Sequence, residues 1–163
     1  MKRSIVAFHR DDDEWVANLA CGHGQHVRHR PPFQLRPWIE DVDGRRSRLG
    51  ALLDCPLCDR AELPAGLEPI APTLRWDERT MPADLRVAHR LTRGTWSRIV
   101  VREGRLRVLA RTTPALDVVI DPDTPQAIPP DVDYSLQPMG TVRFAVELYG
   151  VPPRSGDVLG MSP

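Results

Sequence analysis

The chain has no stretch approaching the roughly 18 consecutive apolar residues that a membrane-spanning helix requires. Its start, from Met1 to His9, also lacks the long apolar segment of a secretory signal. These two absences predict a cytoplasmic protein with no membrane partner. A net charge of one sign is missing as well, because 22 basic and 22 acidic residues give a formal charge of zero. The overall attraction that most sequence-independent nucleic-acid binders use is therefore absent, which disfavours nucleic acid as a partner.

Cysteine is scarce, with three residues at positions 21, 55 and 58. Three thiols cannot form a full disulfide framework, and an odd count without an export signal favours thiolate metal ligands. The sequence also contains no Ser-His-Asp arrangement, phosphate-binding glycine loop or dinucleotide-binding glycine motif. Nucleophilic hydrolase and nucleotide chemistry are therefore left without support.

Proline is abundant, and three of the 17 prolines fall within residues 63–72. This segment has no alternation long enough for a strand, and it predicts a linker over residues 61–73. The linker divides the chain into a first module, residues 1–60, and a second module, residues 74–151. A flexible tail is expected over residues 152–163.

Short strands and turns are predicted for the first module. Residues 15–20 favour a strand that enters a turn at Gly22 and Gly24, and residues 25–30 favour its return arm. A weak helical spacing over residues 44–53 predicts one helix before the last two cysteines.

Alternation of apolar and polar residues is the main pattern of the second module. It predicts a strand over residues 85–91, whose inward-facing side carries His89. Glu103 and Gly104 favour a hairpin turn between the two strands that follow. Many short strands with such turn signals are typical of a sandwich or barrel, so the predicted fold class is mainly β. Further strands are expected over residues 96–102, 105–112, 116–120 and 142–149.

Two short motifs predict a metal site. Cys21-Gly22-His23 and Cys55-Pro56-Leu57-Cys58 supply three thiolates and an imidazole, the donor set that tetrahedral structural zinc prefers. Their order and spacing resemble the second zinc site of RING-type folds, although this resemblance is limited to the site. A module of about 60 residues also gains much from a metal, because its own core is small. We expect one structural Zn²⁺ per chain, held by Cys21, His23, Cys55 and Cys58.

Two alternatives to this ligand set remain open. His26 and His29 follow His23 at intervals of three residues, so His26 is a possible replacement for His23. The favoured interpretation makes both of them surface histidines or hydrogen-bonding neighbours of the site. A redox role for the Cys-x-x-Cys motif is disfavoured because the motif does not open a helix after a strand within a βαβ unit.

Arginine is concentrated in two regions. Ten arginines stand against four acidic residues between positions 75 and 111, and cross-strand pairing with the acidic segment that follows is expected to cancel this excess. In the first module, the acidic run over residues 11–14 is expected to neutralise a cluster that is otherwise suited to phosphate. That cluster comprises Arg28, Arg30, Arg36, Arg45, Arg46 and Arg48.

The first module resembles a small bacterial family of unknown function, sometimes called pressure-regulated proteins. The resemblance covers nearly all of residues 1–60 and is specific. It is carried by WVANLACGHGQHVRHRPP at residues 15–32, RPW at residues 36–38 and LDCPLCDR at residues 53–60. It implies a domain defined by the Cys and His positions and supplies no activity.

The second module resembles the cupin-like domain of tellurite-resistance-associated proteins. The resemblance is carried by His89 and by MPADL, GTW, VREGRL, IPP and VRFAVELY, which begin at residues 81, 94, 101, 128 and 142. It implies a small β-barrel with a lumen able to hold a metal or small ligand. Metal-binding cupins use several histidines, whereas this segment keeps only His89 and has Tyr134 where the later histidine is expected. His89 and Tyr134 are therefore the candidate ligand-binding residues of the lumen.

These observations predict a zinc-stabilised β-rich module followed by a cupin-like β-barrel. The favoured function is a non-enzymatic, stress-associated protein whose barrel binds or senses a small molecule or oxyanion, as the tellurite-resistance resemblance implies. The alternatives are a metal-dependent cupin enzyme of unknown substrate and a nucleic-acid-binding adaptor. Edge strands of cupin-like barrels often pair, so a homodimer is an expected partner state.

Overall fold

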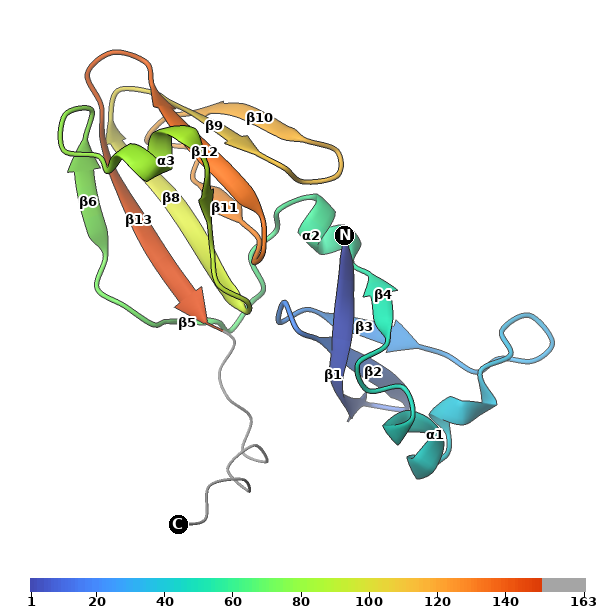
Figure 1. Ribbon diagram of the computed structural model, residues 1–163. Coiled ribbons are helices and arrows are strands. Elements are labelled where there is room, and N and C mark those ends of the chain that lie inside the picture. Colours follow the sequence, from blue (N-terminus) through green and yellow to red (C-terminus); the bar gives the residue numbers. More distant parts are fainter. Residues whose placement is uncertain (151–163) are drawn as a thin grey trace, which may run out of the picture.

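A computed structural model describes residues 1–150, so position 151 and the predicted tail over residues 152–163 lie outside the described residues. Figure 1 shows a small N-terminal sheet beside a larger assembly of two sheets. All the pairings between named strands are antiparallel in the described part of the chain. The mainly β class predicted from the sequence is confirmed.

The N-terminal sheet contains four strands. They are β1 (Lys2–Asp11), β2 (Glu14–Leu19), β3 (Gly24–Val27) and β4 (Leu52–Asp54). Their order across the sheet is β3-β2-β1-β4. The strand and return arm predicted around the glycine turn correspond to β2 and β3. Because β1 pairs with both β2 and β4, the turn after β2 and the end of β4 lie at the same end of the sheet.

The helix predicted over residues 44–53 is wrong in extent. Helix α1 spans only Val42–Arg46, after a 3-10 turn, η1 (Pro37–Ile39), and the chain then enters β4. The side chain of Asp41 caps the helix by accepting a hydrogen bond from the Gly44 backbone N–H at 2.7 Å. Gly50, with φ of +81°, allows the turn that separates α1 from β4. A second short helix, α2 (Pro56–Asp59), follows β4.

The C-terminal sandwich is built from two sheets and one short helix. One sheet has the order β10-β9-β12-β7, and the other has the order β11-β8-β13-β5, with β6 also paired to β13. The elements are β5 (Glu68–Pro69), β6 (Leu74–Asp77), α3 (Ala83–Val87), β7 (His89–Arg90), β8 (Thr95–Glu103), β9 (Leu106–Ala110), β10 (Leu116–Ile120), β11 (Gln126–Ile128), β12 (Asp133–Pro138) and β13 (Arg143–Gly150). The strands predicted around residues 96–102, 105–112, 116–120 and 142–149 correspond to β8, β9, β10 and β13.

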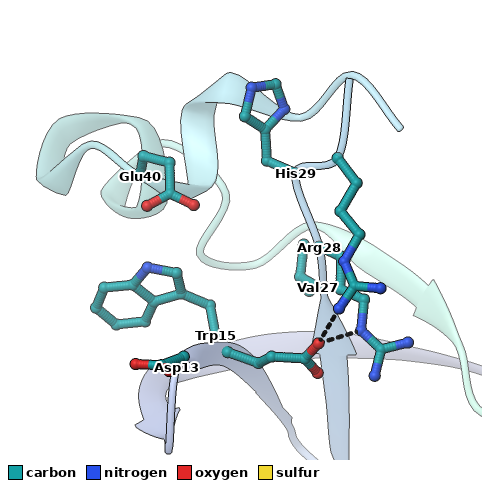
Figure 2. A pocket seen from close by; sticks show the side chains of 8 residues that line it. Asp13, Trp15, Val27, Arg28, His29 and Glu40 are labelled. Carbon is teal, nitrogen blue, oxygen red and sulfur yellow. Dashed lines mark hydrogen bonds and ion pairs between the residues drawn. The ribbon is translucent and has the colours of Figure 1, made fainter. Parts of the chain in front are cut away.

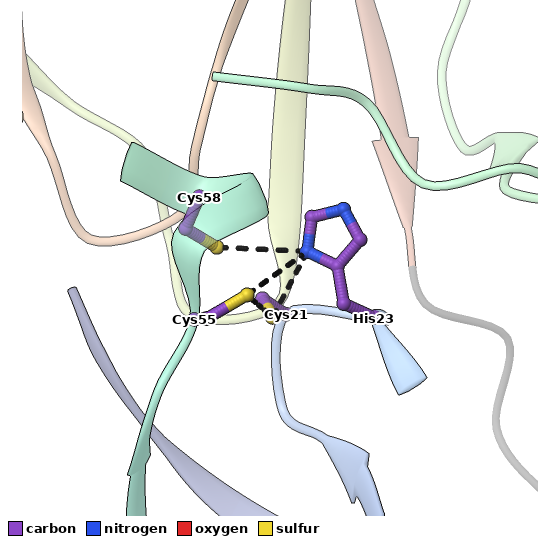
Figure 3. Close-up of side chains that lie close together, drawn as sticks. All are labelled: Cys21, His23, Cys55 and Cys58. Atoms are coloured by element: carbon purple, nitrogen blue, oxygen red, sulfur yellow. Dashed lines mark hydrogen bonds between the residues drawn. The ribbon is translucent and has the colours of Figure 1, made fainter. Parts of the chain in front are cut away.

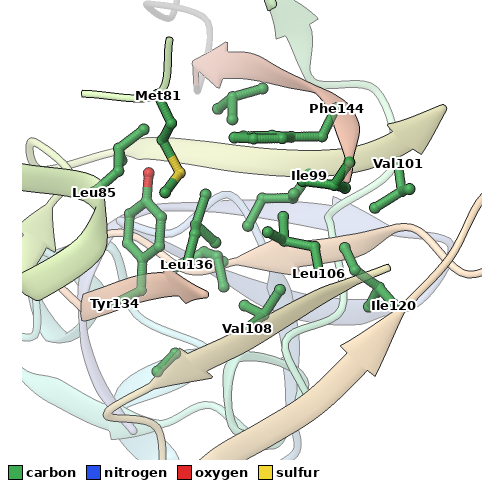
Figure 4. Close-up of a cluster of buried hydrophobic side chains, with 14 of the residues drawn as sticks. Met81, Leu85, Ile99, Val101, Leu106, Val108, Ile120, Tyr134, Leu136 and Phe144 are labelled. Carbon is green, nitrogen blue, oxygen red and sulfur yellow. The ribbon is translucent and has the colours of Figure 1, made fainter. Parts of the chain in front are cut away.

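Apolar side chains fill the space between the two sheets. Ile99 and Leu106, from opposite sheets, have no exposed surface, and Phe144 is 2% exposed. Figure 4 shows these side chains meeting in one layer, with Met81 and Leu85 closing one end. The interior that the cupin resemblance predicts as a ligand-holding lumen is thus occupied by a hydrophobic core. Burial of this core is the main stabilising contribution to the sandwich.

The hairpin predicted at Glu103 and Gly104 is wrong, because β8 and β9 pair with different sheets. The turn instead takes the chain from one sheet to the other at the edge of the core, so that Val101 and Leu106 both point inward. Gly104 has φ of +78°, and a side chain there would collide with the Thr141 carbonyl oxygen. Close backbone approach from the neighbouring turn therefore requires glycine at this crossing.

We expect Gly104→Ala to destabilise the sandwich by about 2–4 kcal/mol, because it combines a strained positive φ with a backbone collision. Gly140→Ala is the matched control, since Gly140 has φ of +88° but, among residues 1–150, no atom within 4 Å of the place that an added methyl group would take. The control isolates the conformational cost of about 1 kcal/mol. Urea unfolding of both variants measures the difference, and equal losses would contradict a close approach at Gly104.

The strand predicted over residues 85–91 is also wrong. Residues Ala83–Val87 form α3, and only His89–Arg90 form a strand, β7. In the helix, Leu85 faces the core at 4% exposure whereas Val87 is 80% exposed, so the two do not share one face. The predicted strand overlaps the helix only over residues 85–87. A stretch that short cannot distinguish the two-residue period of a strand from the 3.6-residue period of a helix.

The two parts of the chain are packed together. Strand β5 lies in the segment predicted as a linker and pairs with Tyr149 and Gly150 of β13. Trp96 of β8 is fully buried in the core of the N-terminal sheet, beside Leu19 and Ile39. A second hydrophobic cluster therefore joins the N-terminal sheet to the sandwich.

Candidate metal centre

The loop between β2 and β3 places Cys21 and His23 on one side of the centre. Gly22 has φ of +93°, and its N–H donates to the Leu19 carbonyl at 2.8 Å. The N–H of Leu19 in turn donates to the His23 carbonyl at 2.9 Å. These two bonds fold the Cys-x-His segment into a tight turn, so that both side chains point to the same side. The predicted turn at the glycines is the element that forms this half of the site.

The end of β4 and helix α2 supply the other two sulfurs. Cys55 is the residue before the helix, and Pro56 at the first helical position begins the turn with its fixed φ. The Asp59 N–H donates to the Cys55 carbonyl at 3.2 Å, which closes the turn around Cys58. The Cys-x-x-Cys spacing therefore places both thiols on the inner side of one helical turn.

All four predicted ligands converge in the structure. Their ligand atoms lie within 4.8 Å of one another, and all four residues are buried. Nδ1 of His23 lies 3.5, 3.3 and 3.7 Å from the sulfurs of Cys21, Cys55 and Cys58, and the sulfurs of Cys21 and Cys55 are 3.9 Å apart. Figure 3 shows this ring nitrogen facing the three sulfurs.

These distances match the edges of a metal tetrahedron. With a metal–sulfur bond of about 2.3 Å and a metal–nitrogen bond of about 2.0 Å, tetrahedral geometry gives S···S and S···N edges of about 3.8 and 3.5 Å. Disulfide bonding would require a sulfur–sulfur distance of about 2.0 Å, and the three thiols are free. The four donor atoms thus fit one metal ion bound through Nδ1 of the histidine.

The electrostatics of the cluster also suit a cation. Burial opposes protonation of His23, but hydrogen bonds with Cys21 and Cys55 outweigh it and raise the pKa of the imidazole to about 9. Hydrogen bonds with Cys21 and Cys58 lower the pKa of the Cys55 thiol. Hydrogen bonds with Cys21 and Cys55, together with burial, raise the pKa of the Cys58 thiol instead. The thiolate is therefore favoured at Cys55, and a positive charge is favoured beside that sulfur.

Trp96 of the sandwich completes the wall of the centre. Its indole N–H donates to the Cys21 carbonyl at 2.7 Å, and its ring meets the His23 imidazole edge to face at a centroid distance of 5.5 Å. Trp96 has no exposed surface. The sequence carries no local signal of this role, since Trp96 lies 75 positions away from Cys21. The only hint was the GTW segment in the family resemblance.

The two alternative histidines lie outside the cluster. His26 is about half exposed, and its Nδ1 lies 3.1 Å from the Glu14 carboxylate. Nδ1 of His29 accepts a hydrogen bond from the Arg36 backbone N–H at 3.0 Å. The structure thus brings His23, rather than His26 or His29, to the three cysteines.

The arginines of the first module are largely held by local partners. Glu14 accepts hydrogen bonds from Arg28 at 2.6 Å and Arg30 at 2.8 Å, drawn as dashed lines beside the pocket in Figure 2. The hydrogen bond from Arg28 lowers the pKa of Glu14. The guanidinium of Arg45 instead stacks 3.8 Å from the centroid of the Trp15 ring. The expected neutralisation by the acidic run is therefore present at Glu14.

His89 and Tyr134 are neighbours but do not frame a lumen. They are paired across β7 and β12, and their rings meet edge to face at 5.5 Å. Nδ1 of His89 lies 3.0 Å from the Asp84 carboxylate near the surface. Tyr134 is 3% exposed within the core, and burial raises the pKa of its phenol to about 12. A phenol whose pKa is raised in this way is a poor metal ligand.

The fold and the cluster define a mainly β protein in which a buried Cys3His metal-binding site lies against a two-sheet sandwich. Comparison with protein families agrees with both parts. Residues 6–62 match the family described as a protein of unknown function, DUF3565, and residues 72–146 match the TehB-like domain. The two resemblances inferred from the sequence are confirmed.

Two solved structures are similar to about half of this chain. A crystal structure of a protein from Escherichia coli K12 aligns with a TM-score of 0.48 and 21% identity, over 55% of this chain and 96% of that protein. The crystal structure of TehB from Haemophilus influenzae aligns with a TM-score of 0.47 and 16% identity, over 52% of this chain and 31% of TehB. Among curated proteins no match is found. Within residues 1–150, no helix has the length and apolar character needed to cross a membrane.

Proposed function

We propose that the Cys3His cluster binds one structural Zn²⁺ and that the protein is a non-enzymatic binding protein related to tellurite resistance. The observation that carries the first part is the convergence of four buried ligand atoms within 4.8 Å of one another. Four protein ligands leave no open position for substrate, whereas catalytic zinc sites normally keep one. Three thiolates with an imidazole favour zinc over the harder ions that prefer oxygen ligands.

The position of the centre supports a structural role. Its ligands come from two segments separated by more than 30 residues, and Trp96 adds a third segment from the sandwich. A bound ion would therefore hold the glycine turn, helix α2 and the start of β8 in one arrangement. Metal binding to such a site contributes directly to the free energy of folding.

The sandwich supports a binding role better than metal catalysis. His89 is its single histidine, and the interior carries packed apolar side chains. A cupin-type enzyme would need several inward-facing metal ligands, and neither His89 nor Tyr134 supplies such a group. The proposed bound species is a small oxyanion, which follows from the tellurite-resistance resemblance of the TehB-like segment.

Metal analysis of the purified full chain tests the zinc proposal. We expect one equivalent of zinc in the wild type and in His26→Ala, because His26 lies outside the cluster. His23→Ala is expected to lose zinc affinity by at least tenfold, since it removes one of four ligands. Iron in place of zinc, or unchanged affinity in His23→Ala, would overturn the proposal.

A further inference from the structure

A cleft lies between the N-terminal sheet and the sandwich, and none of the four candidate metal ligands lines it. Its volume is about 250 Å³, and its walls come from β1, the chain just after β2, the start of β4 and the turns before β8 and β12. Lys2 and Arg3 contribute from the first part of the chain, and Arg93, Pro130 and Asp131 contribute from the second. The cleft therefore exists only where the two parts meet.

The charge of this cleft is unbalanced. Lys2, Arg3 and Arg93 supply three positive charges, and Asp131 supplies the single negative charge, which leaves a net charge of +2 in a chain whose formal charge is zero. Lys2 also lies 3.4 Å from Asp54, but both side chains are largely exposed, so this pair contributes little. The cleft is thus a local concentration of positive charge.

Arg93 differs from the arginines near it. Arg90 pairs with Asp133 at 2.7 Å and Arg98 pairs with Glu147 at 3.5 Å. Among residues 1–150, no carboxylate lies within ion-pair distance of Arg93. Its guanidinium therefore remains available to an anion that enters the cleft.

Arg3 is a buried cation whose hydrogen bonds are incomplete. Its side chain is 9% exposed, and it donates to the Pro130 carbonyl at 2.9 Å. Its only carboxylate neighbour within the described residues, Asp131, lies 3.7 Å away, and Nε has no hydrogen-bond partner there. A buried guanidinium without full pairing is costly, so nearby negative charge stabilises it.

We propose that this cleft binds a small inorganic oxyanion, held by Arg3 and Arg93 with Lys2 at its rim. Arginine binds oxyanions through paired N–H groups, and a partly desolvated arginine does so more strongly than an exposed one. The proposal names the site for the oxyanion binding in the proposed function and rests on it. Because the cleft needs both parts of the chain, oxyanion binding also stabilises their packing.

Isothermal titration of the zinc-loaded full chain with inorganic phosphate tests the proposal, with tellurite and sulfate as separate arms at constant ionic strength. We expect saturable binding of at least one of these anions to the wild type. Arg93→Gln should weaken binding at least tenfold, and it should fold normally because Arg93 is exposed. Arg79→Gln is the matched control, since it removes one charge from a side chain that is 87% exposed and lies outside the cleft.

The zinc content of each variant separates the two proposals. If zinc is bound but none of the three anions binds, or if Arg93→Gln and Arg79→Gln bind equally well, the oxyanion site is wrong while structural zinc stands. If zinc is absent and an anion still binds in a manner sensitive to Arg93→Gln, the cleft stands and structural zinc is wrong. Binding of phosphate alone, without tellurite, supports the cleft and removes the link to tellurite.

Discussion

Replacing Cys55 and Cys58 by serine is expected to unfold the N-terminal sheet at room temperature. Structural zinc in small domains contributes about 10 kcal/mol or more of apparent free energy at neutral pH, whereas a domain's whole stability is about 5–15 kcal/mol. The double variant loses two of the four converging ligands, and serine hydroxyls do not replace thiolates as zinc ligands. The free energy that zinc binding supplies to folding would therefore disappear.

The unfolding should at first be confined to the N-terminal sheet. Hydrogen exchange of the double variant should show loss of protection in β1 and β2, while the core strands β9 and β12 keep theirs, because their core is separate from the metal centre. Treatment of the wild type with a strong zinc chelator should reproduce the same pattern. A double variant with normal protection in β2, or one that still binds zinc stoichiometrically, would contradict the structural role.

The metal ligands were readable from the sequence because each half of the site is local. Cys21 and His23 are two residues apart, and Cys55 and Cys58 are three apart, so chelating turns can be inferred without the fold. The choice of His23 over His26 depends on the fold, since both histidines are close to Cys21 in the sequence. The Gly22 turn decides it by directing His23 inward, while His26 in β3 pairs with Glu14.

Other features depend on contacts that the sequence does not display. The alternation on either side of Gly104 identified β8 and β9, but not that the two strands lie in different sheets. The sequence does not predict strands β1, β4, β5, β6, β11 and β12, as several are short and gain their definition from neighbouring strands. The filled interior was missed because the family resemblance implied an open lumen, and packing of side chains such as Ile99 and Leu136 follows from the fold alone.

Trp96→Ala is expected to destabilise the protein by about 4 kcal/mol and to weaken zinc binding. Deletion of a fully buried large aromatic side chain typically costs about 3–5 kcal/mol, and Trp96 has no exposed surface. The variant also leaves the Cys21 carbonyl without its 2.7 Å hydrogen bond and removes the ring that packs on His23. Since the same side chain joins the sandwich to the metal centre, stability and zinc affinity should fall together.

Trp96→Phe separates packing from hydrogen bonding. Phenylalanine keeps much of the apolar volume but has no N–H for the Cys21 carbonyl, so we expect a smaller loss of about 1–3 kcal/mol. Phe144→Ala is the matched control, because Phe144 is 2% exposed in the sandwich core and does not contact the metal centre. Urea unfolding and competition for zinc with a chromophoric chelator measure the two quantities. If Phe144→Ala and Trp96→Ala lower stability alike but only Trp96→Ala lowers zinc affinity, Trp96 is the side chain through which the sandwich stabilises the metal centre. Equal zinc affinities in all three variants would show that the centre forms independently of the sandwich.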